Sequence, residues 1–545
     1  MLQAWSVEAV RAAEAAAMAE LLEGELMQRA SRGLAKVLHA RLSGLAEMVG
    51  GDDQIHVPLN VVVLAGSGGN GGDALFASAF LANGSARRQG RDKRREVPEP
   101  RLDITAVLVA PRAHAPALDA AREAGVRVVE VFGPVDESAH ASAADENAIA
   151  QVCELLEGAD LVVDGVYGIG GRPDLAADGA SPEVWRLVQA IGDDAYVVAV
   201  DLPSGADPEG NLPVANCVFA DETVTFSLFK GVHLLSGEDA SGILTLVDIG
   251  LDDPVEAPTV ERLDFDDVAE LWPVPGPADD KYSRGVLGVV AGGENYTGAA
   301  LLSVGAAVEA GAGMVRYIGP PGATALVRAQ VPEAVHGDGR VQAWLVGPGL
   351  DPHPADDDEA GQAQVRAARA ALDSGLPAVV DAGGLDLLEG PRPGAGARTL
   401  LTPHAGELAR LLVRLDPETD ETFTAADVVR DPVAAARRAA ELLHATVLLK
   451  GHRTLVVPPV ASLPVRAQSN APAWLATAGA GDVLAGIAGA LLACGLDPVD
   501  AGSLAALVHG VAADDANPGG PIRARRVAEQ IGPTVARLLR HSALR

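Results

Sequence analysis

The chain has 545 residues, which is too long for one hydrophobic core and predicts two to four domains. Its 42 basic and 74 acidic residues give a formal net charge of −32, which argues against nucleic acid or an anionic membrane surface as a partner. Three cysteines lie far apart without a Cys-x-x-Cys pair, so we expect a reducing compartment, and no histidine–cysteine set has the spacing of a zinc site.

The N-terminal 30 residues carry scattered acidic side chains and no apolar core followed by a cleavage site. We therefore predict one or two helices there rather than a signal peptide. No run of 18 or more residues avoids both charge and loop signals, so we predict no membrane span. Together these features lead us to expect a cytoplasmic protein.

Compact apolar segments recur through the first half of the chain, with Ala-rich or amphipathic stretches between them. They lie at residues 60–66, 102–110, 126–133, 159–168 and 195–205. Apolar strands that alternate with helices predict a parallel sheet covered on both faces. A basic run at 84–101 interrupts the pattern, and we interpret it as a solvated loop or insertion.

A segment rich in Pro and Asp, residues 256–284, predicts a linker and domain entry. A second alternating series follows it, at residues 285–293, 313–320, 341–349, 376–384 and 445–451. We therefore predict two tandem three-layer α/β/α domains, residues 1–255 and 285–545.

The first glycine cluster, GSGGNGGD at 66–73, follows a strand and contains the pattern GxGxxG. A dinucleotide-binding fingerprint also needs an acidic residue about 20 positions later, at the end of the next strand. Here the basic run occupies that region and the next strand ends in LVAPR, so an ordinary dehydrogenase loses support. What remains is a glycine turn that presents Asn70 and Asp73 at the carboxyl end of a strand.

Two more strands of this half end in an aspartate. Asp164 closes LVVD and Asp201 closes VVAVD, and glycines follow both. A single strand-end aspartate is more often a helix cap, but three such strand ends with glycine loops favour one convergent pocket. An oxygen-rich pocket without histidine suits a hard cation better than zinc.

The segments VLAGSGGNGGDALFASAFL, VVDGVYGIGGRPD, VAVDLPSG and TFSLFKGVHLL resemble, in order, the motifs of NAD(P)H-hydrate epimerases, the YjeF N-terminal family. The resemblance covers about residues 5–250 and implies a Rossmann-like domain. It implies a potassium ion (K+) held by Asn70, Asp164 and Ser204. It implies a site for the hydrated dinucleotide at Asn70, Gly71, Gly72, Asp73, Gly168, Ile169, Gly170, Gly171, Arg172 and Asp201. We favour Asp201 for proton transfer at C6 of the hydrated ring, and Lys230 matches a lysine that the family places close by.

Three positions depart from the epimerase motifs. Gly69 stands where the family usually has asparagine, Ala74 where it has glycine, and Arg172 follows GIGG one position early. These departures keep open an alternative in which the first half is a non-catalytic binding module.

The stretch TAGAGDVLAGIAGALL, residues 477–492, predicts a buried helix after a glycine loop. Gly479 and Gly481 allow a ligand to approach the backbone closely, and free amides at a helix N-terminus favour an anion. From this stretch alone, Asp482 is equally an ordinary N-cap or a participant in chemistry.

Six segments look like the ADP/ATP-dependent NAD(P)H-hydrate dehydratase domain of the ribokinase-like fold, over about residues 265–540. They are KYSRGVLGVVAGGENYTGAALLSVGAAVEAGAGMVRYIGP, WLVGPGL, VVDAGGLDLL, LLTPHAGELARLL, VLLKGHRTLVV and TAGAGDVLAGIAGALL. The resemblance implies that Asp482 accepts the proton of the attacking hydroxyl, while the loop amides before it bind the transferred phosphoryl group. It implies a hydrate site at Ala300, Gly349, His404 and Asp482, and a nucleotide site at Lys450, Gly451, His452, Arg453, Thr454 and Gly481. Gly384 and Asp386 depart from the usual DADALN motif, whereas Asp381 is kept.

Together the two resemblances imply a bifunctional enzyme that repairs hydrated NADH and NADPH. The first half would convert the R epimer to the S epimer, and the second would dehydrate the S epimer at the expense of ADP or ATP. We expect ADP, yielding AMP and phosphate, with K+ in the first domain and Mg²⁺ in the second. We also expect a homo-oligomer. The alternative is a ribokinase-like kinase for a vitamin or other small alcohol, which would leave a stable phosphorylated product.

Overall fold

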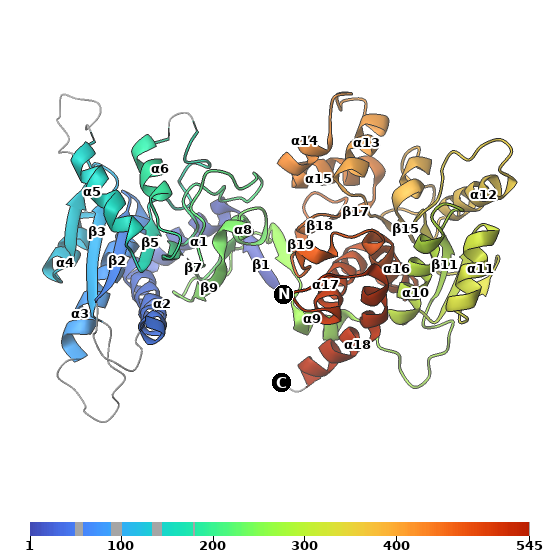
Figure 1. Ribbon diagram of the computed structural model, residues 1–545, viewed down its shortest axis with the longest axis horizontal. Helices are drawn as coiled ribbons and strands as arrows, with labels where there is room; N and C mark the ends of the chain where they lie inside the picture. Colours follow the sequence, from blue (N-terminus) through green and yellow to red (C-terminus); the bar gives the residue numbers. More distant parts are fainter. Residues whose placement is uncertain (50–57, 89–100, 133–143, 178–179, 544–545) are drawn as a thin grey trace. The chain divides into compact units, whose positions relative to one another are not determined.

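The computed structural model describes residues 1–49, 58–88, 101–132, 144–177 and 180–543. The chain forms two compact units, Gln3–Pro258 and Met1–Leu2 together with Thr259–Arg545 (Figure 1). Most of the basic run predicted as an insertion, residues 89–100, lies outside the described residues. Among the described residues, no helix combines the length and apolar composition needed to cross a bilayer.

The first unit contains a seven-stranded, all-parallel sheet in the order β4-β3-β2-β5-β6-β7-β9. Its strands are β2 (Leu59–Ala65), β3 (Leu102–Leu108), β4 (Arg127–Glu130), β5 (Leu161–Gly165), β6 (Tyr196–Val200), β7 (Glu222–Phe226) and β9 (Ile243–Val247). A short parallel pair, β1 (Leu2–Trp5) with β8 (Phe229–Lys230), accompanies it. The parallel sheet predicted from the alternating apolar segments is confirmed.

Alternation along β2 explains why helices cover both faces of this sheet. Val61 and Val63 pack in the same cluster as Leu34 of α2, whereas Val62 and Leu64 share a cluster with α5. The first cluster also takes in α3 and α4, and the second takes in α6. The helices of this unit are α1 (Val7–Glu20), α2 (Glu25–Val49), α3 (Gly69–Arg88), α4 (Ala115–Glu123), α5 (Glu146–Glu157), α6 (Pro182–Gln189), α7 (Gly231–Leu234) and α8 (Glu238–Ser241).

The sheet of the second unit follows the order β13-β12-β11-β14-β15-β16-β17-β18-β19-β10. Its pairs are parallel except β17–β18 and β18–β19, which form an antiparallel hairpin and its continuation. The strands are β10 (Val260–Arg262), β11 (Val286–Val290), β12 (Met314–Ile318), β13 (Val335–His336), β14 (Ala343–Val346), β15 (Ala378–Val380), β16 (Thr399–Leu401), β17 (Thr446–Leu449), β18 (Thr454–Val457) and β19 (Val465–Gln468). Strand β10 falls in the segment predicted as a linker.

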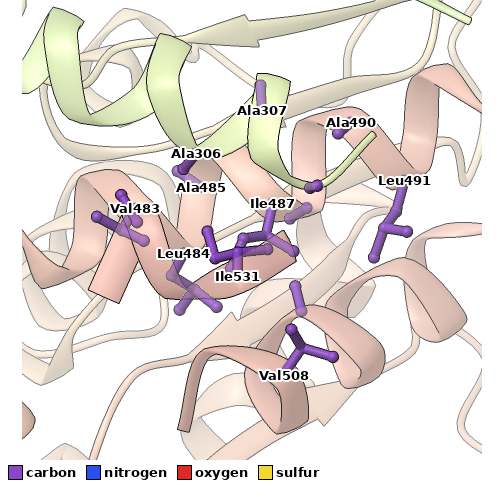
Figure 2. Packing of buried hydrophobic residues seen from close by; sticks show 14 of the residues in the cluster. Ala306, Ala307, Val483, Leu484, Ala485, Ile487, Ala490, Leu491, Val508 and Ile531 are labelled. Carbon is purple, nitrogen blue, oxygen red and sulfur yellow. The ribbon is translucent and has the colours of Figure 1, made fainter. Parts of the chain in front are cut away.

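Small residues allow helices α10 and α16 of the second unit to pack closely against each other. Figure 2 shows Ala306 and Ala307 of α10 beside Ala485 and Ile487 of α16. At Gly486 of α16 an added Cβ would lie 2.4 Å from the Ser303 carbonyl oxygen, so only glycine permits this approach. The helices are α9 (Phe265–Leu271), α10 (Thr297–Glu309), α11 (Pro321–Gln330), α12 (Glu359–Asp373), α13 (Ala405–Leu415), α14 (Ala425–Arg430), α15 (Pro432–Leu443), α16 (Ala480–Ala493), α17 (Pro498–Ala516) and α18 (Ala524–Ala543). Short 3₁₀ turns occupy Ala382–Leu387 and Ala473–Leu475.

The strand order places a binding crevice in each unit. In the first, the chain runs from β2 outward through β3 to β4 and then returns to β5 on the other side of β2. In the second, it runs from β11 through β12 to β13 and returns to β14. Open parallel sheets bind ligands at such reversals, outside the carboxyl ends of the strands. The α/β class with two sheet-based units is thus confirmed.

Candidate active sites

A cavity of about 1050 Å³ opens beside the carboxyl ends of β2, β5 and β6 in the first unit. The sequence-predicted residues that line it are Asn70, Asp73, Gly168, Ile169, Gly170, Gly171, Arg172 and Asp201. Four others, Gly71, Gly72, Asp164 and Ser204, do not line it; the last two are fully buried. The cavity is large enough for a substantial part of a dinucleotide.

Asn70 connects three strand ends at this cavity. Its Nδ2 donates to the Tyr167 carbonyl at 3.3 Å, after β5, and to the Val200 carbonyl at the end of β6. An added Cβ at Gly168 would lie 2.5 Å from Asn70 Oδ1, so this glycine lets the loop after β5 approach the amide. The amide is therefore fixed in orientation by its backbone partners.

Asp164 and Ser204 form a buried, oxygen-rich pair. Ser204 Oγ donates to Asp164 Oδ1 at 2.6 Å and its amide donates to Oδ2 at 2.8 Å, while the Val166 amide donates to Oδ1 at 3.2 Å. Burial raises the pKa of Asp164, and within the described part of the chain no cationic side chain pairs with the carboxylate. A buried carboxylate without a cationic partner is costly, and with the Asn70 amide this oxygen donor set fits a hard cation.

Asp201 pairs with Lys230 in the interior. Lys230 Nζ contacts Asp201 Oδ1, and the Lys230 side chain is 1% exposed against 10% for that of Asp201. The Thr225 hydroxyl donates to the same carboxylate oxygen at 3.0 Å. Asp201 adopts a φ of 69°, a left-handed conformation that is rare for a residue with a Cβ and that concentrates at functional sites.

His233 supports the backbone of Asp201. Its Nδ1 accepts the Lys230 amide at 3.0 Å, so Nε2 carries the proton and donates to the Asp201 carbonyl at 2.8 Å. Complete burial lowers the pKa of His233 to about 4, which keeps the ring neutral. The sequence motifs did not single out His233 or Thr225; the spacing Lys230-x-x-His233 within FKGVHLL was the available signal.

Asp73 is a second buried acid beside the cavity. Its Oδ1 accepts the Ser31 hydroxyl of α2 at 2.9 Å. Burial raises its pKa to about 8, and the nearby Asp201 and Glu14 carboxylates add to the rise. The carboxyl is therefore largely protonated at neutral pH and can donate a hydrogen bond to a ligand. Sequence reasoning missed Ser31, which lies 42 positions earlier on another helix.

The departures from the epimerase motifs leave this geometry intact. Gly69 is the first residue of α3, and an added Cβ there would have no neighbour within 4 Å. Ala74 lies on α3, is 1% exposed and packs in the hydrophobic core. Ala74 does not line the cavity, whereas Gly69 forms part of its wall.

In the second unit, the helix predicted after the glycine loop is α16. Its N-cap is Gly479, which has a φ of 88° and makes no side-chain cap hydrogen bond. Asp482 lies in the first turn, so the alternative that made it an ordinary N-cap is wrong. An added Cβ at Gly481 would lie 3.4 Å from Lys450 Nζ, which places that ammonium group at the helix N-terminus.

The Lys450 ammonium group lies among three carboxyl groups near the start of α16. Its Nζ donates to Asp381 Oδ1 at 2.7 Å and lies 3.6 Å from Glu407 Oε2. Burial raises the pKa of Asp482 to about 7; Asp381 adds to the rise and Lys450 opposes it. Asp482 therefore has the pKa of an effective general base at neutral pH.

His404 begins α13 and caps it. Its Nδ1 accepts the amides of Gly406 at 3.0 Å and Glu407 at 3.3 Å, while Glu407 Oε2 accepts the His404 amide at 2.8 Å. Nε2 therefore carries the proton of the neutral ring, and the side chain is 55% exposed. A β-bridge between His404 and Lys450 brings the predicted hydrate and nucleotide residues side by side. Sequence reasoning missed Glu407, although its i+3 spacing from His404 is that of a capping box.

The other predicted residues of this unit lie on several different elements. Ala300 is fully buried in α10, and Gly349 follows β14 with a φ of 64°. Residues 450–453 form the turn between β17 and β18, and Thr454 begins β18. Among the described residues, no group of three or more His, Cys, Asp or Glu side chains is placed to hold a metal ion.

Comparisons with known proteins agree with this division. A family model described as NAD(P)H-hydrate dehydratase matches residues 287–528, and one described as YjeF-related protein N-terminus matches residues 23–231. The chain is similar to the bifunctional NAD(P)H-hydrate repair enzyme Nnr of Mycobacterium tuberculosis (strain CDC 1551 / Oshkosh), with 42% identity over 90% of this chain and 89% of the relative.

The protein of the same name from Mycobacterium leprae (strain TN) is 41% identical over 98% of this chain and 99% of its own length. A crystal structure of ADP/ATP-dependent NAD(P)H-hydrate dehydratase from Bacillus subtilis, co-crystallised with ATP/Mg²⁺, aligns with 22% identity and a TM-score of 0.44 over 51% of this chain and 99% of that one. Because relatives align along nearly the whole chain and a family model matches each unit, the chain belongs to the family of bifunctional NAD(P)H-hydrate repair enzymes.

Proposed function

We propose that the second unit dehydrates the S epimer of hydrated NADH or NADPH, and that the first unit converts the R epimer to the S epimer. The observation that carries the proposal is Asp482, a carboxylate with a pKa of about 7 in the first turn of a helix without a side-chain cap, beside the half-buried Lys450. A base and a set of free amide donors at one place suit transfer of a phosphoryl group to a hydroxyl.

In the proposed dehydratase step, Asp482 accepts the proton of the C6 hydroxyl as the hydroxyl oxygen attacks the terminal phosphorus of ADP or ATP, and the bond from that phosphorus to the bridging oxygen breaks, so that AMP or ADP leaves. The amides at the start of α16 and the Lys450 ammonium stabilise the charge that develops on the phosphoryl oxygens. The C6–O bond then breaks, phosphate leaves, and the lone pair of N1 followed by loss of the C5 proton restores the C5–C6 double bond. We expect ADP as the donor.

Mg²⁺ would enter this site with the nucleotide, because its preferred ligands are phosphate oxygens and water with one or two carboxylates. Asp381, Glu407 and Asp482 lie around the Lys450 ammonium group, and one or two of these carboxylates would contact such an ion alongside the phosphate oxygens. When bound, the ion would neutralise charge on the phosphates.

In the proposed epimerase step, the hydrated ring lies in the cavity of the first unit with C6 near Asp201. Lys230, Thr225 and His233 hold this residue in one orientation, so its carboxylate can exchange a proton with the C6 oxygen. Asn70 and the glycines at 168–171 would bind the dinucleotide through amide groups.

Asp164, Ser204 and the amide oxygen of Asn70 would hold K+ beside this cavity. We expect removal of K+ by dialysis into a lithium buffer to abolish R-to-S conversion, and K+ to restore it. Epimer ratios measured by chromatography check this result. Conversion that is equally fast in lithium would contradict the assignment, and hydrogen exchange in β6 and β7 in the same lithium buffer shows whether the first unit remains folded.

The test of the whole proposal mixes purified protein, Mg²⁺, K+ and an R/S mixture of hydrated NADH with ADP or ATP. Absorbance of the reduced nicotinamide is followed. Conversion beyond the S fraction, corrected for spontaneous epimerisation, is expected if both units work. A plateau at the S fraction would leave the first unit silent, and a stable phosphorylated product would favour the small-molecule kinase instead. The faster nucleotide identifies the donor.

The dehydratase rate should depend on pH through Asp482. A base with a pKa of about 7 is protonated, and inactive, below that value, so kcat is expected to rise about tenfold per pH unit below pH 7 and to level off above it. Single-turnover rates at saturating nucleotide and S epimer check this profile. A rate that stays constant between about pH 5.5 and about pH 8 would show that Asp482 does not accept the proton.

A further inference from the structure

Helix α1 forms part of the wall of the first unit's cavity. Glu14 and Met18, one helical turn apart, both line it. Arg11, one turn earlier, donates from Nη2 to the Ile169 carbonyl at 3.2 Å and so ties the helix to the loop after β5. At the start of the helix, the Val7 amide donates to Glu209 Oε1 at 2.9 Å. These contacts hold the Glu14 carboxyl at the cavity.

Glu14 belongs to a connected set of charges around the cavity. Arg11 on α1, Asp201 after β6 and Lys230 before α7 all act on its carboxyl, and Glu14 in turn acts on Asp73 of α3. Burial is the main cause of the raised pKa of Glu14. The Asp201 carboxylate raises it further, and Lys230 and Arg11 oppose the rise. Neither the cavity motifs nor the proposed epimerase step gives this carboxyl a role.

Inversion at C6 needs two proton transfers. The C6–O bond can break only if the leaving oxygen is protonated, whereupon the N1 lone pair forms an N1=C6 iminium and water departs. Water then adds to C6 from the other face of the ring and gives up a proton. The reaction therefore requires one protonated carboxyl group and one carboxylate. A group that is fixed on one side of the ring can transfer a proton only on that face, so a second group is needed for the other face.

We propose that Glu14 is the second proton-transfer residue of the epimerase, acting with Asp201. Glu14 begins as the acid and protonates the departing C6 hydroxyl, while Asp201 begins as the carboxylate and accepts a proton from the incoming water. The net change is R to S with one proton moved from Glu14 to Asp201, and exchange with solvent resets the pair. This inference rests on the proposed epimerase activity.

The test measures R-to-S conversion without nucleotide, so that the dehydratase is silent. We expect Glu14→Gln to lower kcat about 10²- to 10³-fold with an unchanged Kd for hydrated NADH, and Glu14→Asp to recover part of the loss. Glu8→Gln is the matched control, because Glu8 lies on the same helix but is exposed and does not line the cavity. Hydrogen exchange in β6 and β7 shows that the first unit of each variant is folded, and dehydration of pure S epimer normalises for the amount of active second unit.

The pH profile separates proton transfer from positioning. Wild-type conversion should decline on the alkaline side as Glu14 ionises, and the slow Glu14→Gln variant should lack this decline. A variant with wild-type kcat, or one whose loss is entirely in Kd with the alkaline decline retained, would overturn the inference. A wild-type protein that does not interconvert the epimers would instead refute the proposed epimerase function.

Discussion

Asp482→Asn is expected to lower dehydratase turnover about 10²- to 10⁴-fold, the usual contribution of a positioned general base. An amide keeps the shape of the carboxyl but cannot accept the proton of the C6 hydroxyl. Lys450 retains its contacts with Asp381 and Glu407, so nucleotide binding should change little. Single-turnover phosphate release measures the effect, and R-to-S conversion by the same preparation is the control. A loss confined to KM would contradict the role of a base.

The same substitution should stabilise the second unit at neutral and alkaline pH. The pKa of Asp482 is raised to about 7 from a normal aspartate value near 4, so the folded state resists ionisation. The resulting penalty is absent below the unfolded-state pKa, grows as pH rises between the two values, and is complete above about 7. Thermal unfolding of wild type and variant should therefore coincide near pH 4 and separate as pH increases, with the variant having the higher Tm.

Lys230→Met is expected to destabilise the first unit by about 3–5 kcal/mol and to abolish epimerisation. The lysine is 1% exposed, and removing it leaves the Asp201 carboxylate buried without its ion-pair partner. Hydrogen exchange in β6 and β7 measures the change in opening free energy where it occurs. Dehydration of the S epimer reports on the other unit.

Two companion variants make this result specific. The double variant Asp201→Asn with Lys230→Met should recover much of the stability, because a neutral amide next to a methyl group carries no unpaired charge. Arg122→Met breaks a surface ion pair with Glu130, in which the side chains are 49% and 54% exposed, and should cost at most about 1 kcal/mol. If Lys230→Met and Arg122→Met lowered the free energy of unfolding equally, the buried ion pair would contribute no more to stability than the surface ion pair.

The fold could be predicted from the sequence because its signal is local. Alternating apolar strands and Ala-rich helices specify parallel sheets, and the order of strand-end motifs places Asn70 and Asp201 on one cavity. Element boundaries are not specified as closely: the apolar segment 126–133 yields only β4, Arg127–Glu130. The segment 256–284, predicted as a linker and domain entry, contains β10 and α9.

The site could be predicted only in part because its electrostatics depend on distant residues. Burial raises the pKa of Asp482, Asp381 raises it further and Lys450 lowers it; these two residues follow β15 and β17 and lie 101 and 32 positions away in the chain numbering. Glu14 reaches its cavity through a helix that carries no recognisable motif. Such contacts follow from tertiary packing, so the spacing of residues within one sequence segment does not predict them.

The uncapped start of α16 has a consequence for how this protein is stabilised. Most helices satisfy their first amides with a Ser, Thr, Asp or Asn side chain, which contributes about 0.5–2 kcal/mol at all times. Here Gly479 offers no such side chain; the Ala480 amide donates to the Thr477 carbonyl, and the amides of Gly481 and Asp482 remain for an anion. These amides are therefore satisfied only when an anion is bound. By mass action, the free energy of unfolding of the second unit then rises with the concentration of its phosphorylated ligands. A cell depleted of adenine nucleotide would hold a less stable enzyme, independently of any change in its rate.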